Sequence, residues 1–371
     1  MTDDVMTQLA AARTNPSIIM VVGVGGAGGN AVNHMWNLGI KGVDFMVCNT
    51  DQQALDKSPV ELKVRLGSEG LGAGNDPENG RKAAIESLDV VRQRFEASGT
   101  KMVFITAGMG GGTGTGAAPV VAKIAKDMGI LTVGVVTKPF AFEGKRRMTQ
   151  AEQGIAELSA CVDSLIIVPN ERLKYVSDTS ITLQNAFAIA DDVLRQGVQS
   201  ISDLILLPGL VNLDFADVTS VMKDAGYAHM GMGSATGKDK ATVAADMAIS
   251  SPLLETSIDG AKGLIINITA SADVSLDDID AASTMIKDKV SDDANIIWGA
   301  VIDDKMEDAI SVTVIATGFN ADGQIAKKNL TDAVSSASAP VAAKEEPKST
   351  TKDKTDDDDD TFYDIMSIFN K

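Results

Sequence analysis

The glycine-rich segment at residues 108–116, GMGGGTGTG, has a composition suited to binding phosphate. Glycine lets the backbone close around a phosphate group and reaches positive φ freely, and the two threonines add hydroxyl donors. Residues 102–106 before it predict a buried strand, and residues 117–128 after it predict a helix. The segment therefore leads into a helix N-terminus, where unpaired N–H groups and the helix dipole attract anions. A flexible linker is the alternative, but linkers are seldom held between a buried strand and a helix.

Two further glycine-rich segments also follow predicted strands. Residues 23–30 read GVGGAGGN, and residues 70–74 read GLGAG. A helix is predicted after each of them, and the second runs from Pro77 to about residue 97. Another predicted strand ends in the polar residues 49–52. Because ligands of open α/β sheets bind at the carboxyl ends of the strands, one nucleotide would explain all of these segments.

A dinucleotide-dependent oxidoreductase is a competing interpretation. Gly23, Gly25 and Gly28 satisfy the pattern GxGxxG, and Asp51 follows at about the distance of a ribose-binding acid. This hypothesis leaves residues 108–116 unexplained, and neither histidine of the chain is a convincing catalytic residue.

A long helix is predicted at residues 181–207, with Phe187 and Asp191 four residues apart on one face. An aromatic ring could stack on a base, and a carboxylate could accept from a ring N–H and an amino group. Guanine has that pair of donors and adenine does not. The same pattern also suits an ordinary core helix, so both interpretations stay open at this point.

Two carboxylates follow this helix in the sequence NLDFAD at residues 212–217. Asp214 could simply cap a helix, with Asp217 in its first turn. A helix cap is the usual role of such a pattern.

The alternation of strands and helices up to about residue 170 predicts a parallel sheet covered on both faces. A second, α+β domain is predicted from strands at 229–233, 263–270, 295–302 and 309–317 and helices at 240–250 and 276–290. Residues 233–238 resemble a P-loop only superficially, because the first glycine and the Ser or Thr after the lysine are missing.

The composition excludes several classes of protein. A formal net charge of -18 over 371 residues argues against a nucleic-acid-binding surface, which needs a basic patch. Cys48 and Cys161 lie in apolar runs and indicate packing residues of a reducing compartment. His34 and His229 have no metal-ligand companions at useful spacing. With neither a signal peptide nor a membrane span expected, the sequence predicts a soluble, cytoplasmic protein.

The C-terminal residues change character abruptly. Residues 335–361 are rich in Ser, Ala, Pro, Lys and Asp and are predicted to be disordered. Residues 361–371, TFYDIMSIFNK, are apolar again and suit a peptide that docks on another protein. The alternative is that they fold back onto the chain's own body.

Several separated motifs resemble the tubulin-like GTPase family of the bacterial cell-division protein FtsZ. They are TAGM at 106–109, GGGTGTG at 110–116, KPF at 138–140, FEG at 142–144 and NLDFAD at 212–217. The resemblance covers about residues 17–319. It implies a tubulin-like α/β fold, in which a parallel-sheet GTP-binding domain is joined by a long central helix to a smaller α+β domain and a disordered tail. The implied boundaries are a flexible segment at 1–16, the GTP-binding domain at 17–180, the central helix at 181–207, a C-terminal activating domain at 208–320, an acidic linker at 321–360 and a docking peptide at 361–371.

The resemblance also implies site residues. The residues expected to bind GTP are Gly25, Gly26, Ala27, Gly28, Gly29, Asn30, Gly72, Ala73, Gly74, Gly112, Thr113, Gly114, Glu143, Arg147, Asn170, Phe187 and Asp191. The expected catalytic residues are Asn212, Asp214 and Asp217, which would act on the GTP of a neighbouring subunit. Mg²⁺ is expected to be held through the phosphates and water, with no protein ligand.

The function that the resemblance implies is a GTPase, activated by head-to-tail polymerisation into the filaments of the bacterial division ring at mid-cell. Implied partners are the chain itself and, through residues 361–371, division proteins and a membrane-tether protein. This peptide departs from the family pattern at Met366, Ile368, Phe369 and Asn370. A third hypothesis is a structural polymer that uses nucleotide only to fold and does not hydrolyse it.

Overall fold

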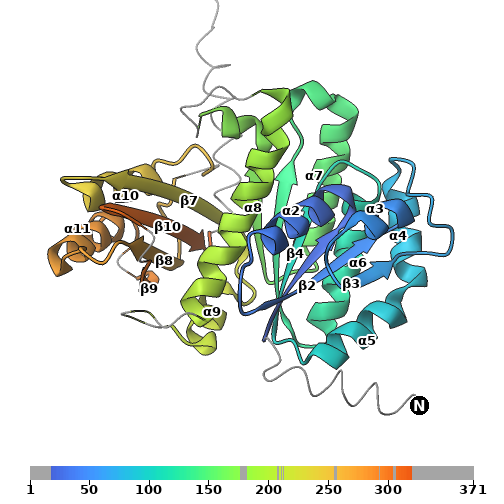
Figure 1. Ribbon diagram of the computed structural model, residues 1–371, viewed down its shortest axis with the longest axis horizontal. Coiled ribbons are helices and arrows are strands. Elements are labelled where there is room, and N and C mark those ends of the chain that lie inside the picture. Colours follow the sequence, from blue (N-terminus) through green and yellow to red (C-terminus); the bar gives the residue numbers. More distant parts are fainter. Residues whose placement is uncertain are drawn as a thin grey trace, which may run out of the picture. The chain divides into compact units, whose positions relative to one another are not determined.

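The computed structural model describes residues 18–175 and 182–319, except for 207–208, 210, 212, 255–256, 292 and 304–305 (Figure 1). The expectations for the N-terminal segment, the acidic linker and the docking peptide fall outside the described residues.

Strands and helices alternate through the first half of the chain, as the sequence predicted. The elements are β1 (Ile19–Val24), α2 (Gly25–Asn37), β2 (Val43–Asn49), α3 (Gln52–Lys57), β3 (Leu62–Arg65), α4 (Pro77–Glu86), α5 (Leu88–Ser98), β4 (Met102–Gly108), α6 (Thr113–Asp127), β5 (Leu131–Lys138), η1 (Ala141–Glu143), α7 (Lys145–Ser159), β6 (Ser164–Pro169) and η2 (Asn170–Tyr175). The strands pair in parallel in the order β3-β2-β1-β4-β5-β6. β1, β4 and β5 are almost wholly buried, which explains why their sequences are continuously apolar.

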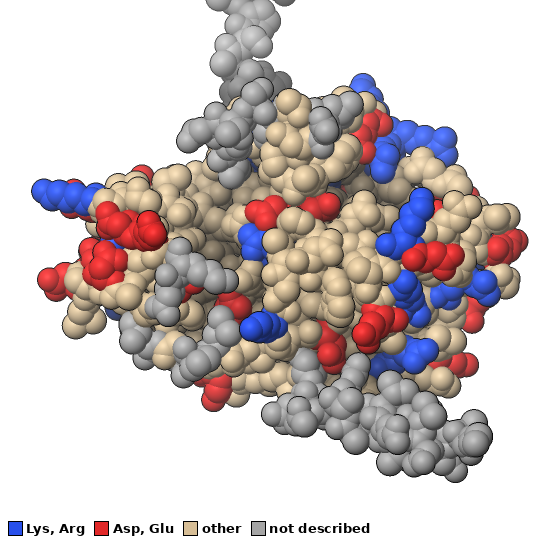
Figure 2. Space-filling model, in the orientation of Figure 1, with Lys and Arg blue, Asp and Glu red and all other residues tan. Residues whose placement is uncertain are grey.

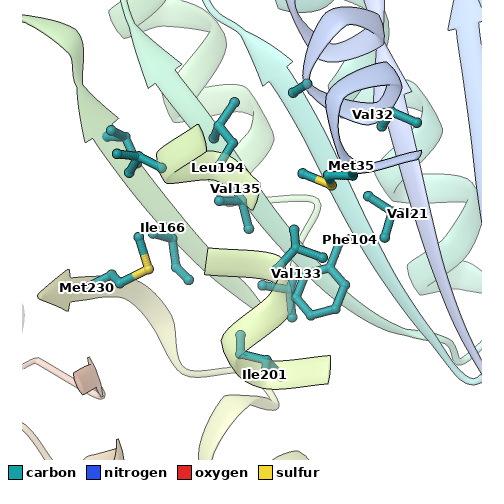
Figure 3. Close-up of a cluster of buried hydrophobic side chains, with 14 of the residues drawn as sticks. Val21, Val32, Met35, Phe104, Val133, Val135, Ile166, Leu194, Ile201 and Met230 are labelled. Atoms are coloured by element: carbon teal, nitrogen blue, oxygen red, sulfur yellow. The ribbon is translucent and has the colours of Figure 1, made fainter. Parts of the chain in front are cut away.

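Alternate residues of these strands face two separate cores. On one face of the sheet, Val21 packs in a cluster with Met35 of α2 and Leu194 of the long helix α8 (Leu183–Leu206), as Figure 3 shows. On the other face, Val22 packs in a cluster with Val121 of α6. The helices that follow the glycine-rich segments are therefore fixed to the sheet by their apolar sides.

The second half of the chain extends the same sheet. Its elements after α8 are α9 (Phe215–Met222), β7 (Gly226–Thr236), α10 (Lys240–Ile249), β8 (Gly263–Ala270), α11 (Leu276–Lys287), β9 (Asn295–Ile302) and β10 (Ala309–Thr317). The first three residues of β7 pair in parallel with β6, and the rest of β7 pairs antiparallel with β10. The result is one ten-stranded sheet that continues as β7-β10-β8-β9.

The structure differs from the sequence prediction at three helix boundaries. α2 begins at Gly25 and α6 at Thr113, so both helices start inside the glycine-rich segments instead of after them. The single helix expected from Pro77 to about residue 97 is divided at Ser87 into α4 and α5. The Ser87 hydroxyl accepts from Gly67 N at 2.9 Å, and this bond ties the break to the loop after β3.

The two cysteines have different environments. Cys48 in β2 is completely buried, and burial raises the pKa of its thiol to about 12. Cys161 is only partly buried, so the expectation of a buried packing residue holds for Cys48 alone. Neither forms a disulfide.

The surface carries both signs of charge. Figure 2 shows basic and acidic side chains interspersed over the described part of this face. Within the residues that the structure describes, no helix has both the length and the apolar character needed to cross a bilayer.

Candidate active site

The segments that follow β1 and β4 meet at the carboxyl edge of the parallel sheet. Gly25, the first residue of α2, has φ of +75°, and a Cβ there would come within 2.7 Å of the backbone nitrogen of Gly114 in α6. Only glycine permits both the conformation and the close approach. The N-termini of α2 and α6 therefore lie side by side.

The loop after β3 lies against the same place. A Cβ at Gly112 would come within 2.8 Å of the Ala73 Cβ and 2.9 Å of the Asp76 nitrogen. The end of β2 also reaches this point, because the hydroxyls of Thr50 and Thr113 are 2.6 Å apart. All three glycine-rich segments thus converge, as one shared ligand requires. Thr50 was not among the predicted site residues, although it belongs to the polar run 49–52 that indicated this edge.

The converging helix ends have donors to offer an anion. The residues that precede α2 and α6, Val24 and Gly112, make no side-chain capping bond, and neither helix has an acidic residue in its first turn. By contrast, Asp51 caps α3 and Asp76 caps α4 through their carboxylates. Uncapped N–H groups and the positive ends of two helix dipoles fit the phosphates of a nucleotide. The capping bonds also give Asp51 a structural role in place of the ribose contact of the oxidoreductase hypothesis.

The converging N-termini of α2 and α6 and the loop after β3 together form a phosphate cradle. Glu143 of η1 and Arg147 of α7 flank this cradle. Glu143 accepts from the Phe140 nitrogen at 2.8 Å, and its other oxygen lies 3.2 Å from Arg147 Nε. A Cβ at Gly110 would come within 2.6 Å of the Arg147 carbonyl oxygen. α7 therefore packs directly on the loop between β4 and α6, which we call the central loop. The ion pair leaves the Arg147 side chain partly exposed beside the phosphate cradle.

The three residues expected to bind guanine come from β6–η2 and from α8. The ring of Phe187 is 47% exposed and contacts the ring of Phe140 edge-on, with centroids 5.6 Å apart. Asn170 is 4% exposed, and its Oδ1 has no hydrogen-bond partner among the residues that the structure describes. Burial raises the pKa of Asp191, one turn beyond Phe187, to about 7. An exposed ring, a buried amide oxygen and a desolvated carboxyl group are suited to bind a polar ring ligand.

Asp214 and Asp217 stand at the N-terminus of α9. Asp214 accepts from the Asp217 nitrogen at 2.8 Å, and Asp217 accepts from the Asp214 nitrogen at 3.1 Å. This reciprocal capping box confirms the helix cap that the sequence indicated. Both residues are nevertheless exposed, and the second oxygen of each carboxylate lies outside the capping box. Asn212 falls outside the described residues.

The two aspartates lie at the opposite edge of the sheet from the glycine-rich loops. Phe187 is near the start of α8, and Leu206 at its end is against Gly42, just before the amino end of β2. With a rise of about 1.5 Å per residue, these two positions are roughly 28 Å apart. α9 follows at the lower end of α8 in Figure 1, and its last carbonyl is bound by Ser164, the first residue of β6. The structure therefore does not bring Asp214 or Asp217 to the phosphate cradle of the same chain.

Known proteins share both halves of this architecture. Residues 18–178 match the Tubulin/FtsZ family, GTPase domain, and residues 226–320 match the FtsZ family, C-terminal domain. The empty FtsZ dimer of M. jannaschii is 40% identical, with a TM-score of 0.78 over 85% of this chain and 92% of that chain. The GDP-bound monomer of CetZ1 and the GTPγS-bound protofilament of CetZ2, both from Haloferax volcanii, are 19% identical with TM-scores of 0.72 and 0.68. Each covers 86% of this chain and 99% of its own, and these two show the fold alone.

These matches confirm the predicted tubulin-like α/β fold and the resemblance on which it depended. They also account for the convergence of the glycine-rich segments, because the matched N-terminal domain is a GTPase domain that binds GTP and GDP. This chain belongs to the FtsZ family of tubulin-like GTPases.

Proposed function

We propose that this chain is a self-assembling GTPase whose active site is completed only between two subunits. The observation that supports it is the separation of the phosphate cradle from Asp214 and Asp217 by the length of α8. A head-to-tail contact would place the α9 end of one subunit over the cradle of the next. Such a contact does not close on itself and so generates a filament. The related FtsZ structure from M. jannaschii is a dimer, which favours self-association.

The cradle binds GTP and holds its phosphates in position. Backbone N–H groups at the N-termini of α2 and α6 donate to the phosphate oxygens, and the Thr113 hydroxyl adds a donor. Asn170, Phe187 and Asp191 select guanine, with the Asp191 carboxylate accepting from the ring N–H and amino group. Mg²⁺, held by the phosphates and water, would neutralise phosphate charge when bound.

The aspartates of the neighbouring subunit supply what the cradle lacks. Phosphoryl transfer depends mainly on positioning and charge stabilisation, and a residue must still orient the attacking water. The free oxygens of Asp214 and Asp217 can accept from that water and direct its lone pair toward the γ-phosphate. Asn212, next to them in sequence, is assigned to the same group. Hydrolysis therefore requires assembly.

In the cell, these filaments would form the division ring at mid-cell in the cytoplasm. Residues 361–371 would dock onto division proteins and a membrane-tether protein. Membership of the FtsZ family supports these proposed roles, and the residues that would carry the docking lie outside the described part of the chain.

The decisive experiment measures GTPase rate against protein concentration. We expect a cooperative onset, with a steep rise in rate per subunit at the concentration where filaments first pellet. A rate per subunit that stays constant from dilute to concentrated protein would contradict a shared site. Filaments that form without releasing phosphate would favour the non-hydrolysing polymer, and tight NAD binding with indifference to GTP would favour the oxidoreductase.

A further inference from the structure

The short helix that carries the two aspartates is held at its other end by both domains. The last four carbonyls of any helix have no partner within it. In α9, the carbonyl of Met222 accepts from the Ser164 hydroxyl at 2.6 Å, and the carbonyl of Val221 accepts from the Thr317 hydroxyl at 3.0 Å. Ser164 begins β6 in the GTPase domain, and Thr317 ends β10 in the C-terminal domain.

Both hydroxyls are inaccessible to water. Ser164 is 0% exposed and Thr317 is 1% exposed. Water therefore cannot replace either hydroxyl at its carbonyl. Gly263, which pairs with Thr317, leaves room for this approach, because a Cβ there would lie 2.6 Å from the Thr317 hydroxyl oxygen and 2.9 Å from a Val221 methyl.

The geometry of α9 makes its C-terminal end the fixed point. Val218 and Met222 are fully buried in the main core, whereas Asp214 and Asp217 are exposed at the N-terminal end. The helix has eight residues and is about 12 Å long. A tilt of about 5° at the buried end would displace the carboxylates by about 1 Å, and a displacement of that size can lower a catalytic rate about 100-fold.

We propose that Ser164 and Thr317 are positioning residues, which fix the direction of α9 and so place Asp214 and Asp217 over the GTP of the adjacent subunit. This inference rests on the proposed shared site. It assigns a role in the reaction to two buried hydroxyls that lie on different domains. Because each domain contributes one hydroxyl, the position of the two aspartates depends on both domains.

The first test uses steady-state kinetics of Ser164→Ala, Thr317→Val and the double variant. We expect the double variant to lose about tenfold in kcat at saturating GTP, with GTP affinity and apparent KM unchanged, because only the trans-acting groups move. Thr317→Ser keeps the hydroxyl and should retain the normal rate. Ser202→Ala is the matched control, since this buried hydroxyl bonds only to the Val198 carbonyl of its own helix, at 2.9 Å.

The second test asks which face of the subunit is impaired. In mixed filaments, Gly112→Ala subunits present a normal α9 and should restore turnover of the GTP bound to the double variant. Asp214→Ala subunits lack the carboxylate and should not. Equal recovery with both partners, a weakened GTP affinity, or an equal loss in Ser202→Ala would overturn the positioning role.

The same mixtures separate this inference from the proposal beneath it. Asp214→Ala mixed with Gly112→Ala involves neither Ser164 nor Thr317, and their co-assembled filaments should regain turnover at mixed junctions. If co-pelleted filaments of that pair stay inactive, the shared site fails and the positioning role fails with it. If that pair is active while the double variant behaves like the wild-type protein, only the positioning role is overturned.

Discussion

The two edges of the parallel sheet differ in what they offer a ligand. The carboxyl edge presents glycine backbone, hydroxyls and helix N-termini that no side chain caps. The amino edge presents α9, whose N-terminus is capped by its own two carboxylates. The carboxyl edge is suited to hold an anion within one molecule. Under the proposed shared site, the carboxylates at the amino edge act on the nucleotide of another molecule, so that a single molecule has a complete binding site but an incomplete catalytic one.

The edges also differ in how they are built. The cradle is assembled within one domain, from loops that pack on each other around Gly112. α9 lies where two domains meet, and each domain donates one hydrogen bond to its last carbonyls. A change in how the two domains pack on each other should therefore leave the cradle intact but alter the direction of α9.

The largest expected effect comes from Asp214→Asn. Asparagine caps a helix about as well as aspartate, so the melting temperature should stay unchanged. The uncharged amide cannot polarise water in the same way, and the assembly-dependent GTPase rate should fall by about 10²–10⁴-fold with GTP binding intact. Ser275→Ala removes a comparable capping box on α11. It should lower stability by about 1 kcal/mol without changing the rate. If Asp214→Asn keeps full activity, Asp214 is only a cap and the comparison between the edges fails.

At the other edge, Gly112→Ala should weaken GTP binding. The added methyl would force the loops of Ala73 and Asp76 away from the central loop, and we expect an affinity loss of roughly tenfold or more, since each 1.4 kcal/mol of lost contact is tenfold. Equilibrium binding of a fluorescent GTP analogue measures it. Gly112 has φ of -73°, so alanine there adds a clash without strain at positive φ. Gly129→Ala, at the far end of α6 where φ is +74° and a Cβ meets nothing within 4 Å, strains the backbone away from the cradle and controls for a general loss of stability. Equal affinity in both variants would remove the central loop from the cradle.

The pKa of Asp191 predicts a moderate pH dependence of GTP binding. Burial raises this pKa to about 7, so the free protein holds a neutral carboxyl group at acidic pH. Guanine needs the ionised form as an acceptor, and GTP affinity should fall about tenfold per pH unit below pH 7. Asp191→Asn should bind GTP weakly with a flat pH profile. If GTP affinity depends on pH in Asp191→Asn as it does in the wild-type protein, another group causes that dependence.

The same shift affects the stability of the nucleotide-free protein in the opposite direction. The folded-state pKa of Asp191 exceeds the unfolded value of 3.8, so its contribution to stability is fully present below that value. It is lost as the pH rises through about 7. Between pH 5 and 8, the melting temperature should therefore fall less in Asp191→Asn than in the wild-type protein.

The smallest effect is expected from deleting residues 361–371. If binding and chemistry reside at the two edges of the sheet, the deletion should leave the GTPase rate and its cooperative onset unchanged. Capture of partner proteins by the full chain, compared with the deleted one, measures the docking role. A large loss of GTPase activity would mean that residues 361–371 take part in GTP binding or hydrolysis.

The sequence predicted the carboxyl edge well because its signals are local. A strand, a glycine-rich segment and a helix are adjacent in the chain, and their order alone indicates a phosphate site. The sequence did not reveal that α2 begins at Gly25 and α6 at Thr113, because glycine at a helix N-terminus is indistinguishable from glycine in a loop. Ser87 was missed because its break depends on a bond to Gly67, which lies on another element.

The amino edge could be predicted only in part. The capping pattern of Asp214 and Asp217 is local, and the sequence indicated both its structural and its chemical interpretation. The support for α9 is not local, because Ser164 and Thr317 are 58 and 96 residues away from the carbonyls that they bind. Serine and threonine in strands are common, and nothing in the neighbouring sequence distinguishes these two.

The change of partner along β7 has a mechanical consequence. Gly226–Ala228 hydrogen-bond to β6, and the strand from His229 onward hydrogen-bonds to β10. The two halves of the sheet are thus joined in series, along the covalent backbone of a single strand. Within the sheet, a pull on the C-terminal domain reaches the GTPase domain as tension in that backbone, and three residue pairs of the β6 ladder hold the start of β7. Hydrogen bonds that tie α8 and α9 to the C-terminal strands share the load outside the sheet. β7 is the strand through which the sheet transmits load, and its first three residues are where the sheet should yield first.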